Sequence, residues 1–306
     1  EIQNYVEQGL MSTKRKDVAR AYITYRNDRT RERQARSDFQ HRLIKKLKAS
    51  EVANQNANVD ERSFGGRAGE VNSEVLRQQA LDFFLSEKAR RNHLENRVYI
   101  HDLDHYVLGD HNCLSIPFDK LLANGFNTRQ ADIRPANSVD TAFQLLAVIF
   151  QLQSLQQFGG VSATHLDWTM VPYVRRSFTK HLKTGMKYLE KLSDYKIERF
   201  EQWIKHDLHQ DKTVHLSDYE EFGIHHPDVW EYAMDMTRKE TQQAVEGMYH
   251  NLNTLQSRSG NQLPFTSINY GTCTLPEGRM VIQALLEGAL KGVGKLRFSL
   301  ARFSNV

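Results

Sequence analysis

The sequence predicts an α/β protein in which a helical arm precedes a body of alternating strands and long helices. Three segments carry this prediction. Asp17–Arg36 has apolar residues at helical spacing and lacks glycine and proline. Thr141–Phe158 is apolar on nearly every side, as in a buried helix. Leu263–Thr272 is rich in β-branched and aromatic residues, which favours a strand.

The arm spans residues 1–48, and we expect it to be helical. Val18, Tyr22 and Tyr25 repeat at helical spacing. Residues 49–57 are polar and rich in asparagine, which indicates a linker, so a compact body should begin near residue 58. Lys14–Lys48 is dense in basic residues. A solvated helix face is the ordinary interpretation, and binding of nucleic acid or an acidic partner is the alternative.

The first part of the body should contain a loop, a helix and two strands. Ser63–Ser73 holds three glycines within five positions, which predicts a loop. Glu74–Glu95 has a helical pattern, Val98–Tyr106 should begin as a short strand, and a second strand should surround Cys113.

The later part of the body should be mainly helical. The buried helix Thr141–Phe158 should end at Gly159-Gly160, and its glutamines then need partners inside the protein. Further helices are predicted over Val171–Leu192, Asp228–Gln256 and Pro276–Gly294, whereas the histidine-rich stretch Asp194–Pro227 should be a polar connection.

The composition is that of an ordinary globular protein, with 40% hydrophobic and 25% charged residues among 306. The longest strongly apolar run, Leu145–Phe150, is too short to cross a membrane, and the first residues do not resemble a signal peptide. The two cysteines, Cys113 and Cys273, form neither a disulfide framework nor a CxxC zinc motif. They favour a cytoplasmic protein with free thiols.

Several polar residues are candidates for chemistry. Cys113 is either a small buried hydrophobe or a redox thiol, and the second role requires an accessible, polar position. Asp102 and Asp104 would share one face of a strand and could hold a cation, although capping or pairing with arginine is commoner. Cys273 is better explained by structural burial. The histidines do not follow a known zinc spacing, so we expect no metal site; they are His206, His209, His215, His225 and His226.

Long strings of this sequence resemble one family. The strings NANVDERSFGGRAGEVNS, KARRNHLENRVYIHDLDHYVLGDHNCLSIPF and PFTSINYGT, with the segment from Asn124 to Phe178, look like the first half of the catalytic body of anaerobic (class III, glycyl-radical) ribonucleotide reductases. The resemblance spans roughly Asn54–Lys295. Lys16–Arg33 is similar to the last helix of an ATP-cone, the allosteric domain that precedes that body.

The resemblance implies a domain organisation. Residues 1–48 would be the C-terminal remnant of an ATP-cone, and 58–296 the first part of a ten-stranded α/β barrel of the glycyl-radical type. It implies a homodimer, ribonucleoside triphosphate substrates, ATP, dATP and deoxynucleotide effectors, and a radical S-adenosylmethionine activase as partner. The parent enzyme would carry a glycyl radical and a structural zinc ion, with no cofactor inside this chain. No membrane or nucleic-acid partner is expected.

The resemblance also implies roles for individual residues. Cys113, in HNCLS, matches the second cysteine of the family mechanism, which helps to reduce the 2′ position of the ribose. His111 and Asn112 would lie at the edge of the substrate pocket. An effector triphosphate near the buried helix requires cations and hydrogen-bonding groups, and the candidates are Gln151, Arg175, Arg176 and Lys180.

Several family features match no residue of this sequence: the finger-loop cysteine, the zinc-binding cysteines and the radical glycine. Residues 297–306 also depart from the family pattern, because Arg297 and Arg302 stand where an apolar strand resembling IFPCQIFQ belongs. A frameshift would account for this tail. We therefore expect a fragment of a reductase that is inactive alone; the alternative is a non-catalytic remnant that binds nucleotides or a partner.

Overall fold

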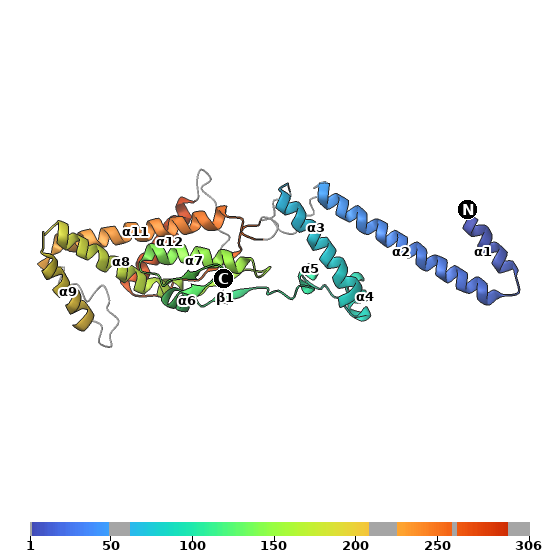
Figure 1. The fold of residues 1–306 in the computed structure, drawn as a ribbon, viewed down its shortest axis with the longest axis horizontal. Coiled ribbons are helices and arrows are strands. Elements are labelled where there is room, and N and C mark those ends of the chain that lie inside the picture. Colours follow the sequence, from blue (N-terminus) through green and yellow to red (C-terminus); the bar gives the residue numbers. More distant parts are fainter. Residues whose placement is uncertain (1, 49–61, 208–224, 259–261, 293–306) are drawn as a thin grey trace. The chain divides into compact units, whose positions relative to one another are not determined.

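The computed structural model describes residues 2–48, 62–207, 225–258 and 262–292 (Figure 1). They divide into two compact units, residues 1–108 and 109–306. Helices dominate both units, and the described strands lie in the second unit. No helix among the described residues is long and apolar enough to cross a membrane.

The first unit begins with the predicted helical arm. Helices α1 (Ile2–Ser12) and α2 (Lys16–Lys48) form the arm and are joined by an ion pair of 2.7 Å between Glu7 and Arg26. Arg42 of α2 donates to Glu74 of the next helix, α3 (Phe64–Gln79), at 2.6 Å, which links the arm to that helix. The helical prediction is therefore confirmed, with one break between α1 and α2. The predicted linker, residues 49–57, lies outside the described residues.

Two predictions for the first unit are wrong. The glycine-rich Ser63–Ser73 is not a loop but the start of α3 (Phe64–Gln79), because the Ser63 hydroxyl caps the helix by accepting from the Gly66 N–H at 2.9 Å. Helix α3 continues into a π-helical turn, η1 (Ala80–Phe84), and α4 (Glu87–Leu94) follows.

Val98–Tyr106 does not begin as a strand. Asp102 has a left-handed backbone with φ of 49°, and the short helix α5 (Leu103–Tyr106) starts directly after it. Asp102 and Asp104 therefore do not share a strand face. Asp104 instead accepts a hydrogen bond of 2.5 Å from the Ser73 hydroxyl, which joins α5 to α3.

The second unit is built around a parallel three-stranded sheet in the order β1 (Leu114–Ile116), β4 (Val161–Ala163) and β5 (Thr266–Ile268). Ser115, Ser162 and Ser267 are in register across the three strands. Helix α6 (Phe118–Asn124) and a small antiparallel pair, β2 (Phe126–Asn127) and β3 (Asp132–Ile133), follow β1. A mixed α/β class is thus confirmed, whereas the ten-stranded barrel and the ATP-cone stay predictions.

Four long helices accompany the sheet: α7 (Val139–Ser154), α8 (Leu166–Tyr188), α11 (Pro227–Thr254) and α12 (Pro276–Lys291). Phe143, Phe150 and Val161 are fully buried in the core that these helices share with the sheet. The predicted helices are confirmed, although α8 begins five residues before the predicted start at Val171. The predicted polar connection is partly wrong, because α9 (Asp194–Asp207) is a helix.

The predicted end of the buried helix is also wrong. Helix α7 stops at Ser154 rather than at Gly159-Gly160, and the Ser154 hydroxyl donates to the Phe150 carbonyl at 2.6 Å. The chain then turns, and the unpredicted strand β4 begins at Val161. The two glycines therefore belong to a helix-to-strand turn.

A buried carboxylate organises the far end of the sheet. Asp167, at the start of α8, has no exposed surface, and its Oδ2 accepts the N–H groups of Gly271, Thr272 and Cys273 at 2.8 to 2.9 Å. Three N–H donors directed at one carboxylate oxygen satisfy the hydrogen-bonding capacity of this buried group. Asp167 thereby fixes the loop between β5 and α12 against α8.

Replacing Asp167 should lower the urea concentration at which the second unit unfolds. Asp167→Ala leaves three buried N–H groups without their acceptor, so we expect the free energy of unfolding to fall by about 3 kcal/mol or more. Asp235→Asn on α11 is the matched control, because Asp235 is half exposed and pairs with Lys239 along its own helix. Urea denaturation followed by circular dichroism measures both, and equal stabilities would contradict the structural role of Asp167.

Candidate active site

Cys113 lies directly before β1, and its thiol is exposed. Its Sγ donates to the Asn112 side-chain oxygen at 3.2 Å and accepts from the Gly160 N–H at 3.3 Å. The second contact joins Cys113 to the turn before β4, on the neighbouring strand. Cys113 is thus the accessible, polar thiol that a redox role requires.

Gln157 connects the segment that contains Asn112 and Cys113 with the turn that contains Gly160. It is 5% exposed, and its amide nitrogen lies 3.2 Å from the Asn112 carbonyl and 2.7 Å from the Gly160 carbonyl. Its own oxygen accepts from Gln153 at 3.0 Å. The Phe158 N–H also donates to the His111 carbonyl at 3.1 Å. These bonds satisfy buried polar groups and fix the backbone on both sides of Cys113.

Gly159 permits the close approach of the two segments. A Cβ atom added to Gly159 would lie 2.1 Å from the Asn112 carbonyl oxygen and 2.3 Å from its side-chain oxygen. Both distances are shorter than any tolerable contact, and the obstacle includes backbone. A side chain at this position would therefore displace Asn112 and Cys113.

Arg258 is the cation of this site. It is 8% exposed, donates to the Phe158 carbonyl, and stacks its guanidinium 4.7 Å from the Phe265 ring centre. Burial lowers the pKa of Arg258, and the negative charge of Asp110 opposes that shift.

A strip of small hydroxyl side chains continues from Cys113 across the sheet. Ser115 and Ser162 lie side by side with their Oγ atoms 2.8 Å apart, and Ser267 is next in register. Val161 and Ala163 on the same strand are fully buried, so Ser162 faces the opposite, open side. Cys113 stands two residues before Ser115 and extends the strip at its edge.

Comparison with known proteins identifies the family. The anaerobic ribonucleoside-triphosphate reductase profile matches residues 55–303. The chain belongs to this reductase family. Curated relatives that carry the same name include the proteins of Haemophilus influenzae, 28% identical over 96% of this chain, and Escherichia coli, 29% identical over 97%. This chain spans 37% of the length of either relative.

Solved structures show a weaker likeness. An anaerobic ribonucleotide reductase from Thermotoga maritima, in complex with dATP and CTP, shares 13% identity with this reductase-family chain at a TM-score of 0.45. The match covers 74% of this chain and 34% of that structure.

Cys273, the other cysteine of this reductase-family chain, lies apart from the Cys113 site. Cys273 is buried, and burial raises the pKa of its thiol, with smaller contributions from Asp167 and Glu277 in the same direction. A Cβ at Gly278 would lie 2.3 Å from its Sγ, so the thiol fills space against α12. The prediction of structural burial for Cys273 is confirmed.

The four predicted effector residues face different neighbours. Arg175 pairs with buried Glu277 of α12 at 2.7 Å, and Arg176 donates to the Ala136 carbonyl at 2.5 Å. Gln151 lies 3.4 Å from the Asn251 carbonyl at the end of α11. The structure therefore does not gather these side chains at one point, and their role stays a prediction.

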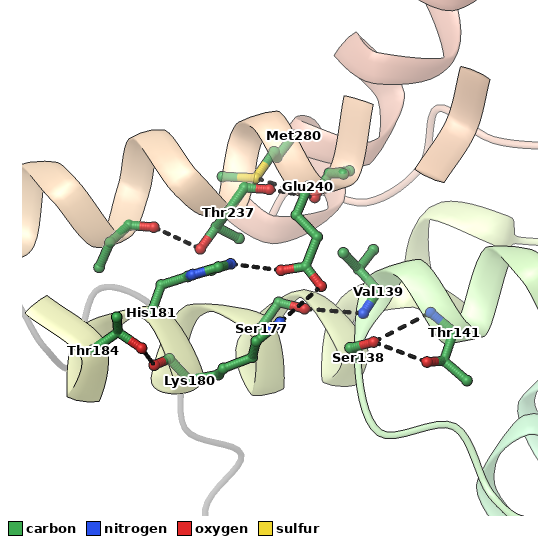
Figure 2. Close-up of polar contacts among 12 residues, drawn as sticks. Ser138, Val139, Thr141, Ser177, Lys180, His181, Thr184, Thr237, Glu240 and Met280 are labelled. Atoms are coloured by element: carbon green, nitrogen blue, oxygen red, sulfur yellow. Dashed lines mark hydrogen bonds and ion pairs between the residues drawn. The ribbon is translucent and has the colours of Figure 1, made fainter. Parts of the chain in front are cut away.

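Lys180 belongs to a polar cluster between α8 and α11 (Figure 2). Lys180 and His181 both point toward Glu240, at 3.6 Å and 2.6 Å, and the hydrogen bond with His181 lowers the pKa of the Glu240 carboxyl. The Ser177 hydroxyl accepts from the Val139 N–H at 3.0 Å, which ties α8 to the start of α7. The Lys180 side chain is 61% exposed, and that of Glu240 is 14% exposed.

The remaining candidates form no metal centre among the described residues. His226 pairs with Glu190 at 2.6 Å, while His209 and His215 lie outside the described part of the chain. Gln157 and Arg258 are functional candidates that the sequence interpretation missed. Only the requirement that glutamines of an apolar helix find internal partners pointed toward Gln157.

The close contact at Gly159 predicts that adding one methyl group there destabilises the protein. Gly159→Ala should lower the free energy of unfolding by about 1–3 kcal/mol, because the added carbon overpacks the Asn112 backbone. Gly247→Ala is the control, since Gly247 lies in α11 with no atom within 4 Å of an added Cβ. Urea denaturation compares the two variants. A Gly159→Ala protein as stable as Gly247→Ala would contradict the close approach.

Proposed function

We propose that this chain is part of an enzyme that reduces ribonucleoside triphosphates to deoxyribonucleoside triphosphates under anaerobic conditions, with Cys113 as a reducing thiol. Membership of the reductase family supports the reaction. The single observation that carries the assignment of Cys113 is its exposed position at the edge of the open sheet face, with its sulfur fixed by Asn112 and Gly160.

The substrate would lie over the serine strip beside Cys113. The small side chains of Ser115, Ser162 and Ser267 leave room for a ribose, and their hydroxyl groups can donate to and accept from sugar hydroxyls. His111 and Asn112 are exposed next to the thiol, at the proposed pocket edge. The Cys113 thiol would then assist reduction at the 2′ position.

The other groups of the proposed reaction belong to the parent enzyme. A glycyl radical would supply the radical that starts the reaction, and a zinc ion would be structural. No residue of this sequence matches the radical glycine, the finger-loop cysteine or the zinc cysteines. Cys113 is proposed as the reducing thiol, and Cys273 is buried, so neither takes one of these roles. We propose that the chain alone is inactive.

The proposed partners also follow from the family. They are a second copy of the reductase, a radical S-adenosylmethionine activase and nucleotide effectors, in a cytoplasmic setting that keeps the thiols free. The specificity effector would bind near α7 and α8. Lys180 is the proposed phosphate contact, because its side chain is mostly exposed although it pairs with Glu240, whereas the side chain of Arg175 is nearly buried in its pair with Glu277.

Cys113→Ser tests the reaction. Installed in the complete reductase that contains this chain, and assayed anaerobically with the activase, it should lower dCTP formation from CTP by at least about a hundredfold, because a hydroxyl cannot act as a redox thiol. Cys273→Ser should retain activity, since Cys273 is buried away from the open sheet face. Full activity of Cys113→Ser would exclude the proposed role and leave a nucleotide- or partner-binding function.

Lys180→Ala tests the effector contact. We expect the affinity for dTTP, measured by isothermal titration calorimetry on the complete reductase, to fall about tenfold, because a charge-assisted hydrogen bond to phosphate is lost. Lys187→Ala is the control on the same helix, with a similarly exposed amine paired to Asp194. Unchanged dTTP affinity of Lys180→Ala would remove Lys180 from the effector site.

A further inference from the structure

The amide nitrogen of Gln157 is surrounded by backbone carbonyl oxygens. It lies 3.2 Å from the carbonyl oxygen of Asn112, 3.3 Å from that of Gly159 and 2.7 Å from that of Gly160. The side chain is only 5% exposed, so these contacts are shielded from water. An amide group has two N–H donors, and here they are shared among three acceptors around the turn that contacts Cys113.

The contact with Gly159 determines the direction of the next N–H group. The peptide bond between Gly159 and Gly160 is trans, so the Gly159 carbonyl and the Gly160 N–H lie in one plane and point in opposite directions. Gln157 donates to the oxygen at one end of this peptide group, and the N–H at the other end donates to the Cys113 sulfur at 3.3 Å. One peptide group therefore connects the Gln157 amide to the thiol.

The local sequence does not fix the orientation of this peptide group. It lies between two glycines, and glycine restricts φ and ψ less than any other residue. Hydrogen bonds must therefore select the orientation. The Leu114 N–H fixes the Gly160 carbonyl at 3.1 Å, beside the pairing of β1 with β4. The Gln157 amide fixes the preceding carbonyl, that of Gly159, and thereby the direction of the Gly160 N–H.

Gln153 sets the polarity of the Gln157 amide. It lies one helical turn earlier, on α7, and its side-chain nitrogen donates to the Gln157 oxygen at 3.0 Å. A reversed Gln157 amide would place its oxygen against carbonyl oxygens and its nitrogen against the Gln153 nitrogen. Buried polar groups without suitable partners are costly, so one orientation is selected. A carboxylate at position 157 has the same shape but cannot donate to these carbonyl groups.

We propose that Gln157 is a positioning residue for the Cys113 thiol, because it orients the Gly159–Gly160 peptide so that the Gly160 N–H fixes the sulfur. The thiol also donates to the Asn112 side-chain oxygen at 3.2 Å, so both contacts select one direction of the side chain. Without the N–H contact, the exposed thiol would sample several rotamers. This inference rests on the proposed function of Cys113, but the peptide orientation can be measured without turnover.

Amide hydrogen exchange at Gly160 tests the peptide orientation. In the 306-residue chain, Gln157→Glu should accelerate exchange of the Gly160 N–H about tenfold, because the N–H is turned away from its acceptor. The Val161 N–H donates to the Phe265 carbonyl at 2.8 Å inside the sheet, and its rate should not change. Gln156→Glu is the matched control, since Gln156 is exposed and the chemical change is the same.

Exchange would be followed by mass spectrometry at single-residue resolution. Equal Gly160 rates in Gln157→Glu and Gln156→Glu, with Val161 protected in both, would overturn the proposal.

Gln153→Glu decides the question if Gln157→Glu unfolds the chain. A carboxylate at position 153 cannot donate to the Gln157 oxygen but can accept from the Gln157 nitrogen, so the Gln157 amide should reverse. Its oxygen would then face the Gly159 carbonyl, and exchange of the Gly160 N–H should accelerate severalfold. Circular dichroism should remain that of the unaltered chain, because Gln153 is only partly buried. An unchanged Gly160 rate in Gln153→Glu would overturn the proposal.

Turnover of the complete reductase tests the effect on reduction. In an anaerobic assay with the activase, Gln157→Glu should lower kcat for CTP about ten- to a hundredfold and leave KM within about twofold, because the thiol is misplaced whereas the substrate contacts remain. Gln156→Glu should retain the kcat of the unaltered enzyme. A Gln157→Glu enzyme with unchanged kcat, whether or not KM rises, would overturn the positioning role.

Different results test this inference and the proposed function of Cys113. Unchanged exchange at Gly160 would overturn the role of Gln157 even if Cys113→Ser abolishes reduction. Faster exchange at Gly160, together with full activity of Cys113→Ser, would support the orientation of the peptide by Gln157 and overturn the proposed function of the thiol.

Discussion

The candidate site depends on the junction between Asn112–Cys113 and Gly159–Gly160. Gln157 bridges the carbonyl groups of both segments, and the parallel pairing of β1 with β4 begins immediately beyond them. Because Gly159 has no side chain, the Asn112 backbone can approach closely enough for the Gly160 N–H to reach the Cys113 sulfur. Without this contact, the thiol would have no defined place on the sheet edge.

Buried charges secure the frame around this junction. Asp167 fixes the loop after β5 through three backbone N–H groups, and Arg175 pairs with Glu277 between α8 and α12. Removing one partner from such an arrangement costs more than the intact pair contributes, because a charge is left buried. These groups therefore tie α8 to the loop after β5 and to α12.

The sequence predicts the long helices well and the short elements poorly. Helices α7, α11 and α12 extend over at least 16 residues, so their periodicity is clear. Strands β1, β4 and β5 have three residues each, too few for an alternating pattern, and β4 was missed between two glycines and a helix. The contact of Arg258 with Phe158 joins residues 100 positions apart, which no local pattern can reveal.

We propose that nucleotide substrate lies against Cys113 on the open face of the parallel sheet. Substrate protection of the two thiols tests this position most directly. In the complete reductase, saturating CTP should slow alkylation of Cys113 severalfold and leave buried Cys273 unchanged. An alkylation rate of Cys113 that is the same with and without bound CTP would contradict the claim.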